Sequence, residues 1–318
     1  MSMQPHDRLV RWAFAHPETA AAAFRGVLPP ALVARVRWSS LQQISGTFVD
    51  PTETNRHSDL LFSARLRRGE EPLLLYLLFE HQSGPDRWMA VRMARYALRA
   101  QDRWLSQSPR ARKLPWVIPL VLYHGRSRWT AATDYRDLLA LPALPEAELL
   151  APTFPYRLLD LSQVCEQDLR LDALGLLVTR LLRHAWERDL WARLPQWGPV
   201  LAQVFEQRGL RALEAVFRYI TEVSDARPGE EVRRWIAVSL GPAAEESMKS
   251  WAQQERDEGR QEGRKEGRQE LFVQVLRRRF GSLSADLEAR VLRAGPADLD
   301  RWLDGLFNAS SPDELLRA

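Results

Sequence analysis

The amino-acid sequence predicts an α/β fold, in which a mixed central sheet flanked by helices is followed by helical C-terminal regions. Three observations favour this class. Two apolar runs surround a charged turn between residues 60 and 80, the segment 116–123 is apolar throughout, and the chain becomes Leu-rich from about residue 166. Strands followed by a helix and a further strand are typical of a sheet that carries helices on its faces.

The N-terminal part predicts helices and a first strand. Apolar residues recur at helical spacing over 5–28, with an interruption at Pro17, and a Pro-Pro pair ends this helix. A second short helix is expected to start within 31–38, and a strand is expected over 45–50.

A β-hairpin is predicted from two strongly apolar runs, 59–66 and 73–80, around the turn sequence RRGEE. If the two strands pair across this turn, Asp59 at the start of the first strand lies beside Glu80 at the end of the second. The hairpin therefore places two carboxylates at one end of a sheet.

A cation site is the chemistry that this cluster favours. Alternate residues of a strand share a face, so Glu80 and Gln82 point the same way and His81 points to the other side. Together with Asp59, they offer two acids and an amide next to backbone carbonyls. Such a set suits a hard divalent cation that prefers oxygen ligands.

A helix with a row of arginines is expected over about 85–105. The arginines recur every three or four residues, so they form one stripe. Guanidinium groups suit phosphate oxygens, and the row could hold a DNA backbone without sequence preference. A solvated helix face explains the same pattern, so both interpretations stay open. The row consists of Arg92, Arg95, Arg99 and Arg103.

Two further strands and a loop complete the predicted sheet. The segment 116–123 suits a strand buried on both faces, although Pro119 lacks a ladder donor and predicts an irregularity. Residues 141–155 contain four prolines and predict a loop, and 155–161 predicts another strand.

The chain divides into four predicted parts. An α/β core comes first, then a helical region, a Gly/Glu/Arg repeat that forms a helix or a linker, and a small helical C-terminal domain. Their ranges are 1–165, 166–250, 251–270 and 271–318.

The repeat DEGRQEGRKEGRQE at 257–270 has a four-residue period. On a helix, Gly259, Gly263 and Gly267 form one stripe, with acids on one flank and arginines on the other. Each Gly costs roughly 1 kcal/mol in a helix interior, and a second helix that approaches closely over the stripe would offset this cost. A charged linker is the other interpretation.

Composition limits the functional classes. The net charge of +4, from 45 basic and 41 acidic residues, does not by itself indicate a nucleic-acid partner. Cys165 is the single cysteine, which excludes an intrachain disulfide and fits a reducing compartment. No segment approaches the roughly 20 apolar residues of a membrane span. We therefore expect a soluble, cytoplasmic protein without a membrane partner.

Five segments, in order along the chain, carry a family resemblance. They are PHDRLVRWAF at 5–14, SGTFVD at 45–50, RHSDLLF at 56–62, LYLLFEHQSGPDRWMAVRMARY at 75–96 and LPWVIPLVLYHGRSRW at 114–129. With them, the chain resembles the recombination-promoting nucleases (Rpn), also labelled YhgA-like transposases, a branch of the PD-(D/E)XK nuclease superfamily. The resemblance is strong over the first half and weaker through the helical remainder.

The resemblance implies a PD-(D/E)XK restriction-endonuclease-like core and a DNA endonuclease that depends on Mg²⁺, with Mn²⁺ as a substitute. Asp59 and Glu80 would hold the ion together with the backbone carbonyl of His81, and Gln82 would orient the attacking water. Gln82 stands where many relatives in the wider superfamily carry Lys, which is usual for this branch. The resemblance also implies a link to DNA recombination or mobile elements.

Two other functions remain open from the sequence. The same core could serve a catalytically weak DNA-binding protein, or the helical half could serve an oligomerising interaction protein. A homo-oligomer, most simply a dimer formed through the C-terminal helical region, is expected in addition to the DNA partner.

Overall fold

A computed structural model describes residues 4–44, 60–67, 72–80 and 86–317. The contacts divide the chain into two compact units, Met1–Glu245 and Glu246–Ala318. We describe each unit by itself.

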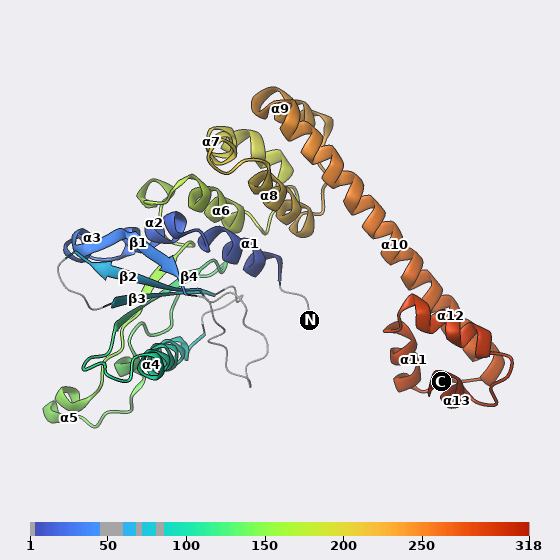
Figure 1. Cartoon of the computed structure of the whole chain (residues 1–318), viewed down its shortest axis with the longest axis horizontal. Coiled ribbons are helices and arrows are strands. Elements are labelled where there is room, and N and C mark those ends of the chain that lie inside the picture. The colour runs from blue at the N-terminus through green and yellow to red at the C-terminus, as the bar shows by residue number, and fades with distance from the viewer. Residues whose placement is uncertain (1–3, 45–59, 68–71, 81–85, 318) are drawn as a thin grey trace. The chain divides into compact units, whose positions relative to one another are not determined.

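The first unit is built on a five-stranded sheet with the strand order β1-β2-β3-β4-β5 (Figure 1). Its antiparallel part joins β1 to β2 and β2 to β3, and its parallel part joins β3 to β4 and β4 to β5. The sheet is mixed, as predicted. The strands are β1 (Val36–Gln43), β2 (Leu60–Leu66), β3 (Pro72–Glu80), β4 (Trp116–Tyr123) and β5 (Arg157–Asp160).

The predicted hairpin is confirmed as β2 and β3, which pair antiparallel with Leu60 opposite Leu77 and Arg65 opposite Pro72. The short helix expected within 31–38 is confirmed as α3 (Pro30–Arg35), but it ends at Arg35, and residues 36–38 already belong to β1, a strand that was not predicted. Pairing of β1 with β2 outweighs the weak local preference of this segment. The strand expected over 45–50 lies outside the described residues.

β4 forms the middle of the parallel part, and all its residues except Trp116 are buried. Pro119 lies opposite Tyr76 of β3, whereas the pairing of β4 with β5 begins only at Leu120. The residue that lacks an N–H therefore lies where β4 has a neighbouring strand on one side only.

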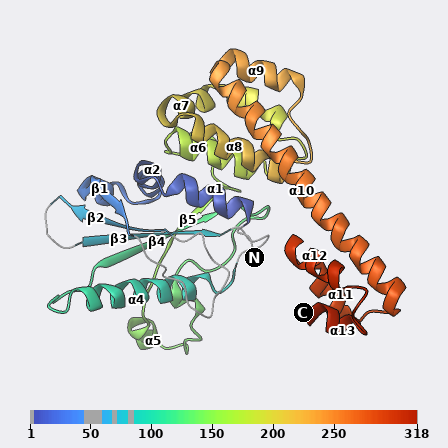
Figure 2. The same cartoon turned by 45° about the vertical axis from the view of Figure 1, so that its right-hand side comes forward.

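Helices cover both faces of the sheet (Figures 1 and 2). α4 (Met89–Gln107) packs on β4 through Met89, Met93 and Tyr96, which are buried in one hydrophobic cluster with Val121. On the opposite face, α2 (Pro17–Val27) packs on β1 and β5, beside α1 (Pro5–Phe14). The predicted α/β class is confirmed.

The Pro-rich segment expected to be a loop contains a short helix, α5 (Pro145–Leu150). Pro145 fits the first helical position because its missing N–H would have no partner there. Glu146 and Glu148 in the first turn further favour a helix N-terminus. Another short helical turn, η1 (Tyr135–Leu138), precedes it.

The helical region after the sheet belongs to the first unit. α6 and α8 both pack against α1, and α7 packs against α6 and α8, so these helices form a second layer over the N-terminal helices. Two short 3-10 helices belong to this region: η2 (Glu166–Asp168) precedes α6, and η3 (Trp191–Trp197) lies between α6 and α7. The helices are α6 (Ala173–Arg183), α7 (Gly198–Arg208), α8 (Leu210–Val223) and α9 (Glu230–Leu240).

The second unit begins within the long helix α10 (Pro242–Phe280), which contains the Gly/Glu/Arg repeat. It continues with α11 (Ala285–Leu292), α12 (Pro296–Gly305) and α13 (Pro312–Arg317). Phe272 and Trp302 stack in its hydrophobic core. No helix in the described parts of the chain carries enough consecutive apolar residues to cross a bilayer.

Candidate functional site at the carboxyl ends of the parallel strands

Three residues mark one end of the parallel sheet. Glu80 of β3 lies opposite Tyr123 of β4, and Tyr123 lies opposite Asp160 of β5. β2 starts near this end, because Leu60 pairs with Leu77, close to the end of β3. Ligands of open α/β sheets commonly bind beyond the carboxyl ends of the strands, so this end is the candidate site.

The predicted metal ligands fall mostly outside the described residues. Asp59, His81 and Gln82 are all in this group, and for Glu80 the structure describes the backbone at the end of β3. Within the described ranges, no three His, Cys, Asp or Glu side chains come together as metal ligands would. The metal site therefore stays a prediction, with Glu80 at the end of the sheet where it was expected.

Asp160 was missed as a residue of this end, although its carboxylate holds two loops. Oδ2 accepts the backbone N–H of Trp129 at 2.9 Å, and Oδ1 accepts that of Ser162 at 2.9 Å. Asp160 is only 7% exposed, and its bond to Trp129 is buried, so this bond is shielded from water. The sequence offered one signal for it: the apolar segment RLLD ends in an acid, just as the apolar run of β3 ends in Glu80.

The loop after β4 is held by packing as well. Tyr123 is completely buried. A Cβ atom on Gly125 would overlap the phenol oxygen of Tyr123, so residue 125 must be glycine. The ring of Trp129 lies 4.9 Å from that of Tyr123 in an edge-on arrangement. Arg126 and Arg128 are presented to solvent from this fixed loop.

A cluster of rings joins the end of β4 to the helical layer. His124 is 2% exposed, and its ring lies 5.0 Å from His6 at the start of α1 and 5.9 Å from Trp186. Nδ1 of His6 makes a 2.8 Å hydrogen bond with Oη of Tyr219. Burial raises the pKa of Tyr219, so its hydroxyl stays neutral at physiological pH. Both histidines pack against neighbouring rings, and His6 in addition makes the hydrogen bond to Tyr219.

The arginine row on α4 is not uniform. Arg92 is 7% exposed, and its guanidinium pairs with Asp86 at 3.0 Å. Asp86 also accepts the N–H of Trp88, which forms a turn and delays the helix to Met89 instead of the expected start near residue 85. Arg95 is exposed, whereas Arg99 and Arg103 are half-buried. DNA binding by this row stays a prediction, and Arg92 is engaged by Asp86.

Sequence reasoning also missed two exposed tryptophans near this end. Trp88 is 50% exposed, and the guanidinium carbon of Arg87 lies 5.0 Å from its ring centre. Trp186 is 46% exposed, and that of Arg126 lies 5.9 Å from its ring centre. The dipeptide Arg87–Trp88 was visible in the sequence, but the pairing of Arg126 with Trp186 arises only in the fold.

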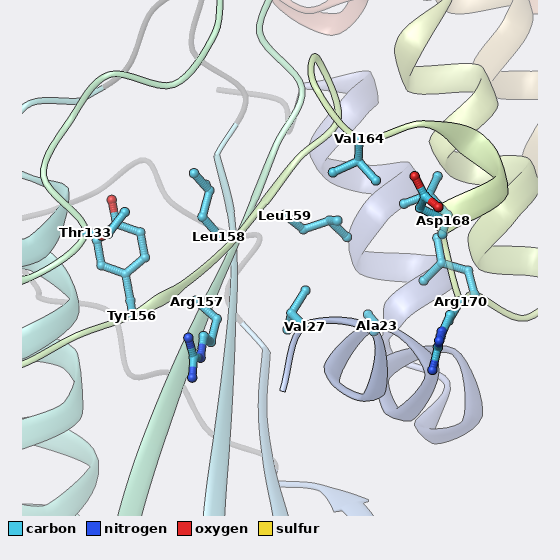
Figure 3. Close-up of a pocket in the computed structure, with 13 residues that line it drawn as sticks. Ala23, Val27, Thr133, Tyr156, Arg157, Leu158, Leu159, Val164, Asp168 and Arg170 are labelled. Atoms are coloured by element: carbon cyan, nitrogen blue, oxygen red, sulfur yellow. The ribbon is translucent and has the colours of Figure 1, made fainter. Parts of the chain in front are cut away.

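Two cavities lie apart from this end. One, of about 490 Å³, lies between α2, β5 and the segment 164–171 (Figure 3). Its walls are mainly apolar, with Arg157, Asp168 and Arg170 as charged residues. The other, of about 540 Å³, lies between α3, α4 and the first half of β4. Neither Tyr123 nor Asp160 is among the described residues that line these two cavities.

Comparisons with known proteins agree on one family. The family model described as "Putative transposase, YhgA-like" matches residues 4–211. Recombination-promoting nuclease RpnA of Escherichia coli K12 is 29% identical over 81% of this chain and 85% of its own length. Recombination-promoting nuclease RpnD of Escherichia coli O157:H7 is 32% identical over 70% and 82%. The inactive recombination-promoting nuclease-like protein RpnE of strain K12 is 26% identical over 80% and 82%. No solved structure matches the chain.

Proposed function

The chain belongs to the YhgA-like transposase family, and from this we propose that it is a divalent-metal-dependent endonuclease that hydrolyses phosphodiester bonds in DNA. Relatives named recombination-promoting nucleases align over most of the chain, which supports both the activity and its link to recombination or mobile elements. The sheet at the centre of the first unit is the part that we assign to a PD-(D/E)XK core.

One observation carries the proposal: the strand that Glu80 ends and the strand that Asp59 precedes in the sequence are neighbours in the sheet. Glu80 closes β3, and Asp59 directly precedes Leu60, the first residue of β2. These strands are hydrogen-bonded neighbours, with Leu60 opposite Leu77. The register brings the start of β2 close to the end of β3, and we propose that the carboxylates of Asp59 and Glu80 meet at that end.

The donor set fits the proposed ion. Carboxylates from Asp59 and Glu80 and the carbonyl of His81 are hard oxygen ligands of the kind that Mg²⁺ and Mn²⁺ prefer. When bound, such an ion lowers the pKa of a water molecule and offsets the charge that develops on the phosphate. Gln82 donates and accepts hydrogen bonds but takes up no proton, so we assign it to orienting the attacking water. The proton of that water must pass to another acceptor, for which the substrate phosphate is at hand.

Electrostatic contacts to the DNA backbone are assigned to the α4 row. Arg95 is the exposed member, and the half-buried Arg99 and Arg103 follow it at four-residue spacing along the same face. Arg92 is assigned to holding the start of α4 through Asp86. We also propose that α10 joins two copies of the chain, because Gly263 and Gly267 are exposed with open space above them.

A catalytically weak DNA-binding protein is the second candidate, because RpnE, which is described as inactive, aligns with 80% of this chain. The test is incubation of supercoiled plasmid with the purified full chain, with Mg²⁺ or Mn²⁺ and with a chelator. We expect nicked and linear DNA only when the metal is present. Plasmid that is shifted in a gel but never cut would support the second candidate, and plasmid that is neither bound nor cut would exclude both.

A further inference from the structure

The two exposed tryptophans lie on either side of the candidate site, and an arginine guanidinium lies near the ring of each. We propose that Trp88 with Arg87 and Trp186 with Arg126 form a surface that binds the unpaired bases of a DNA strand. This inference rests on the proposed function and names its substrate class, namely DNA with single-stranded character at the point of cleavage.

Trp88 is held at the end of the sheet by the start of α4. Its backbone N–H donates to Oδ1 of Asp86 at 2.9 Å, and the other carboxylate oxygen binds Arg92 at 3.0 Å. The buried Met89 follows directly and packs in the core. The backbone of Trp88 is therefore fixed, while half of its side chain faces solvent.

Trp186 is held equally well on the other side. Its ring stacks on His124, the residue after the end of β4, with an interplanar angle of 28°. The turn that carries it is closed by Glu187, which binds His184 at 2.7 Å and Arg193 at 2.8 Å. The nearby Arg126 belongs to the loop whose glycine packs over Tyr123.

The two tryptophans approach this end from opposite faces of the sheet. Trp88 precedes α4, which covers one face, and Trp186 contacts His6 at the start of α1, which lies on the other. Figures 1 and 2 both show the N-terminal ends of α1 and α4 at the same end of the sheet, on opposite sides of it. Between them lie the carboxyl ends of β3 and β4, with Glu80.

This arrangement matches what an unpaired strand offers. Flat indole faces stack on bases of any sequence, and arginines beside them bind the backbone phosphates. In a duplex the bases are stacked on one another and only the phosphates and groove edges are accessible, so the tryptophan faces would gain little. Tryptophan is usually largely buried, which makes two half-exposed rings beside one candidate site informative.

The inference is tested by binding in the presence of a chelator, so that no cleavage occurs. The probes are a fluorescein-labelled DNA strand of about 20 nucleotides and the same sequence as a duplex. We expect Trp88→Ala and Trp186→Ala each to weaken binding of the single strand by about 5-fold or more, and to leave duplex binding almost unchanged. Trp88→Phe and Trp186→Phe keep an aromatic face and should retain most of the affinity.

Two controls match the substitutions. Trp116→Ala removes a tryptophan that is 58% exposed at the opposite end of β4. Phe307→Ala removes an exposed ring with Arg279 at 5.8 Å in the second unit. Neither control should change single-strand affinity.

Equal losses on single strand and duplex, unchanged binding in both alanine variants, or equal losses in the controls would overturn the inference. Tighter binding of the same sequence as RNA would overturn its assignment to DNA. Because no cleavage is measured, an inactive protein that still binds through these tryptophans would refute only the proposed nuclease. A nuclease whose alanine variants bind normally would refute only this inference.

Discussion

The backbone N–H of Trp129 donates to Oδ2 of Asp160 at 2.9 Å, which ties the loop after β4 to the end of β5. Because the second carboxylate oxygen accepts the N–H of Ser162, one side chain satisfies two backbone donors, of which that of Trp129 is buried.

Asp160→Ala should destabilise the first unit by about 1–3 kcal/mol, because both backbone N–H groups lose their acceptor and that of Trp129 is buried. Asp160→Asn keeps one acceptor oxygen and should cost less. Urea unfolding followed by tryptophan fluorescence measures both, with Asp168→Ala as a control at an exposed acid of the same unit. Equal stability of the wild type and the Ala variant would show that the loops are held by other contacts.

Gly125→Ala should also destabilise the first unit, by about 1–3 kcal/mol, because the new methyl group must displace the buried ring of Tyr123. The matched control is Gly229→Ala in the same unit, since a Cβ there meets nothing within 4 Å and its φ of -68° suits alanine. Thermal unfolding followed by circular dichroism compares the two. A Gly125→Ala protein as stable as the wild type would contradict the tight packing.

The turn that carries Trp186 should weaken in acid. Hydrogen bonds from Arg193, and next from His184, lower the pKa of Glu187 from 4.5 to about 2. Its stabilising contribution is therefore fully present above the ordinary carboxyl pKa and is lost as the pH falls toward about 2. The side chain is 36% exposed, so this contribution is at most about 1 kcal/mol.

The measurement for this turn is the difference in unfolding free energy between the wild type and Glu187→Gln. We expect a difference at about pH 7 that becomes smaller at about pH 3. A difference that stays constant over this range would place the effect of Glu187 in something other than its charge.

Asp59→Ala and Glu80→Ala should each abolish metal-dependent nicking of plasmid, because one of two anionic ligands of the proposed ion is lost. Glu146→Ala, at an exposed acid of α5, should cut like the wild type. Circular dichroism shows whether the variants remain folded. Wild-type cleavage by either site variant would refute the assignment of the site.

Replacing Gly259, Gly263 and Gly267 together by Leu should separate association from folding. At Gly263 and Gly267 the described chain leaves open space, so the larger side chains should block a partner helix without disturbing their own unit. Helix content should stay equal or rise, and sedimentation should show a smaller species. The ratio of linear to nicked plasmid should fall, because two sites must act together to break a duplex. Unchanged mass with an unchanged ratio would make the repeat a solvated spacer.

The elements that the sequence predicted well have strong local patterns. The hairpin and β4 are nearly continuous apolar runs, and their ends at Glu80 and Tyr123 agree with the prediction to the residue. β1 was missed because Val36 and Leu41 are its only buried residues, and its strand form depends on pairing with β2. A local sequence pattern cannot predict a strand whose stability comes from pairing with another strand.

The candidate site was predictable only in part, for a related reason. Asp59 and Glu80 are separated by a single predicted hairpin, so the sequence alone predicts that they lie close together. The alignment of Asp160 with Tyr123 depends on how the chain crosses from β4 to β5, and no short motif records that crossing. The stacking of Trp186 on His124 likewise joins residues from different layers.

The hydrogen bond between His6 and Tyr219 spans 213 positions of the chain, and this distance affects how the protein is made. On the ribosome, α1 emerges first, yet the helix α8 that packs against it emerges only after the entire sheet. Until then α1, which carries the fully buried Val10 and Phe14, lacks α8 as a packing partner. Non-local contacts of this kind form late, so the first unit should complete its folding only after α8 has been synthesised. A nascent chain that stalls before α8 is therefore a natural target for chaperones and proteases.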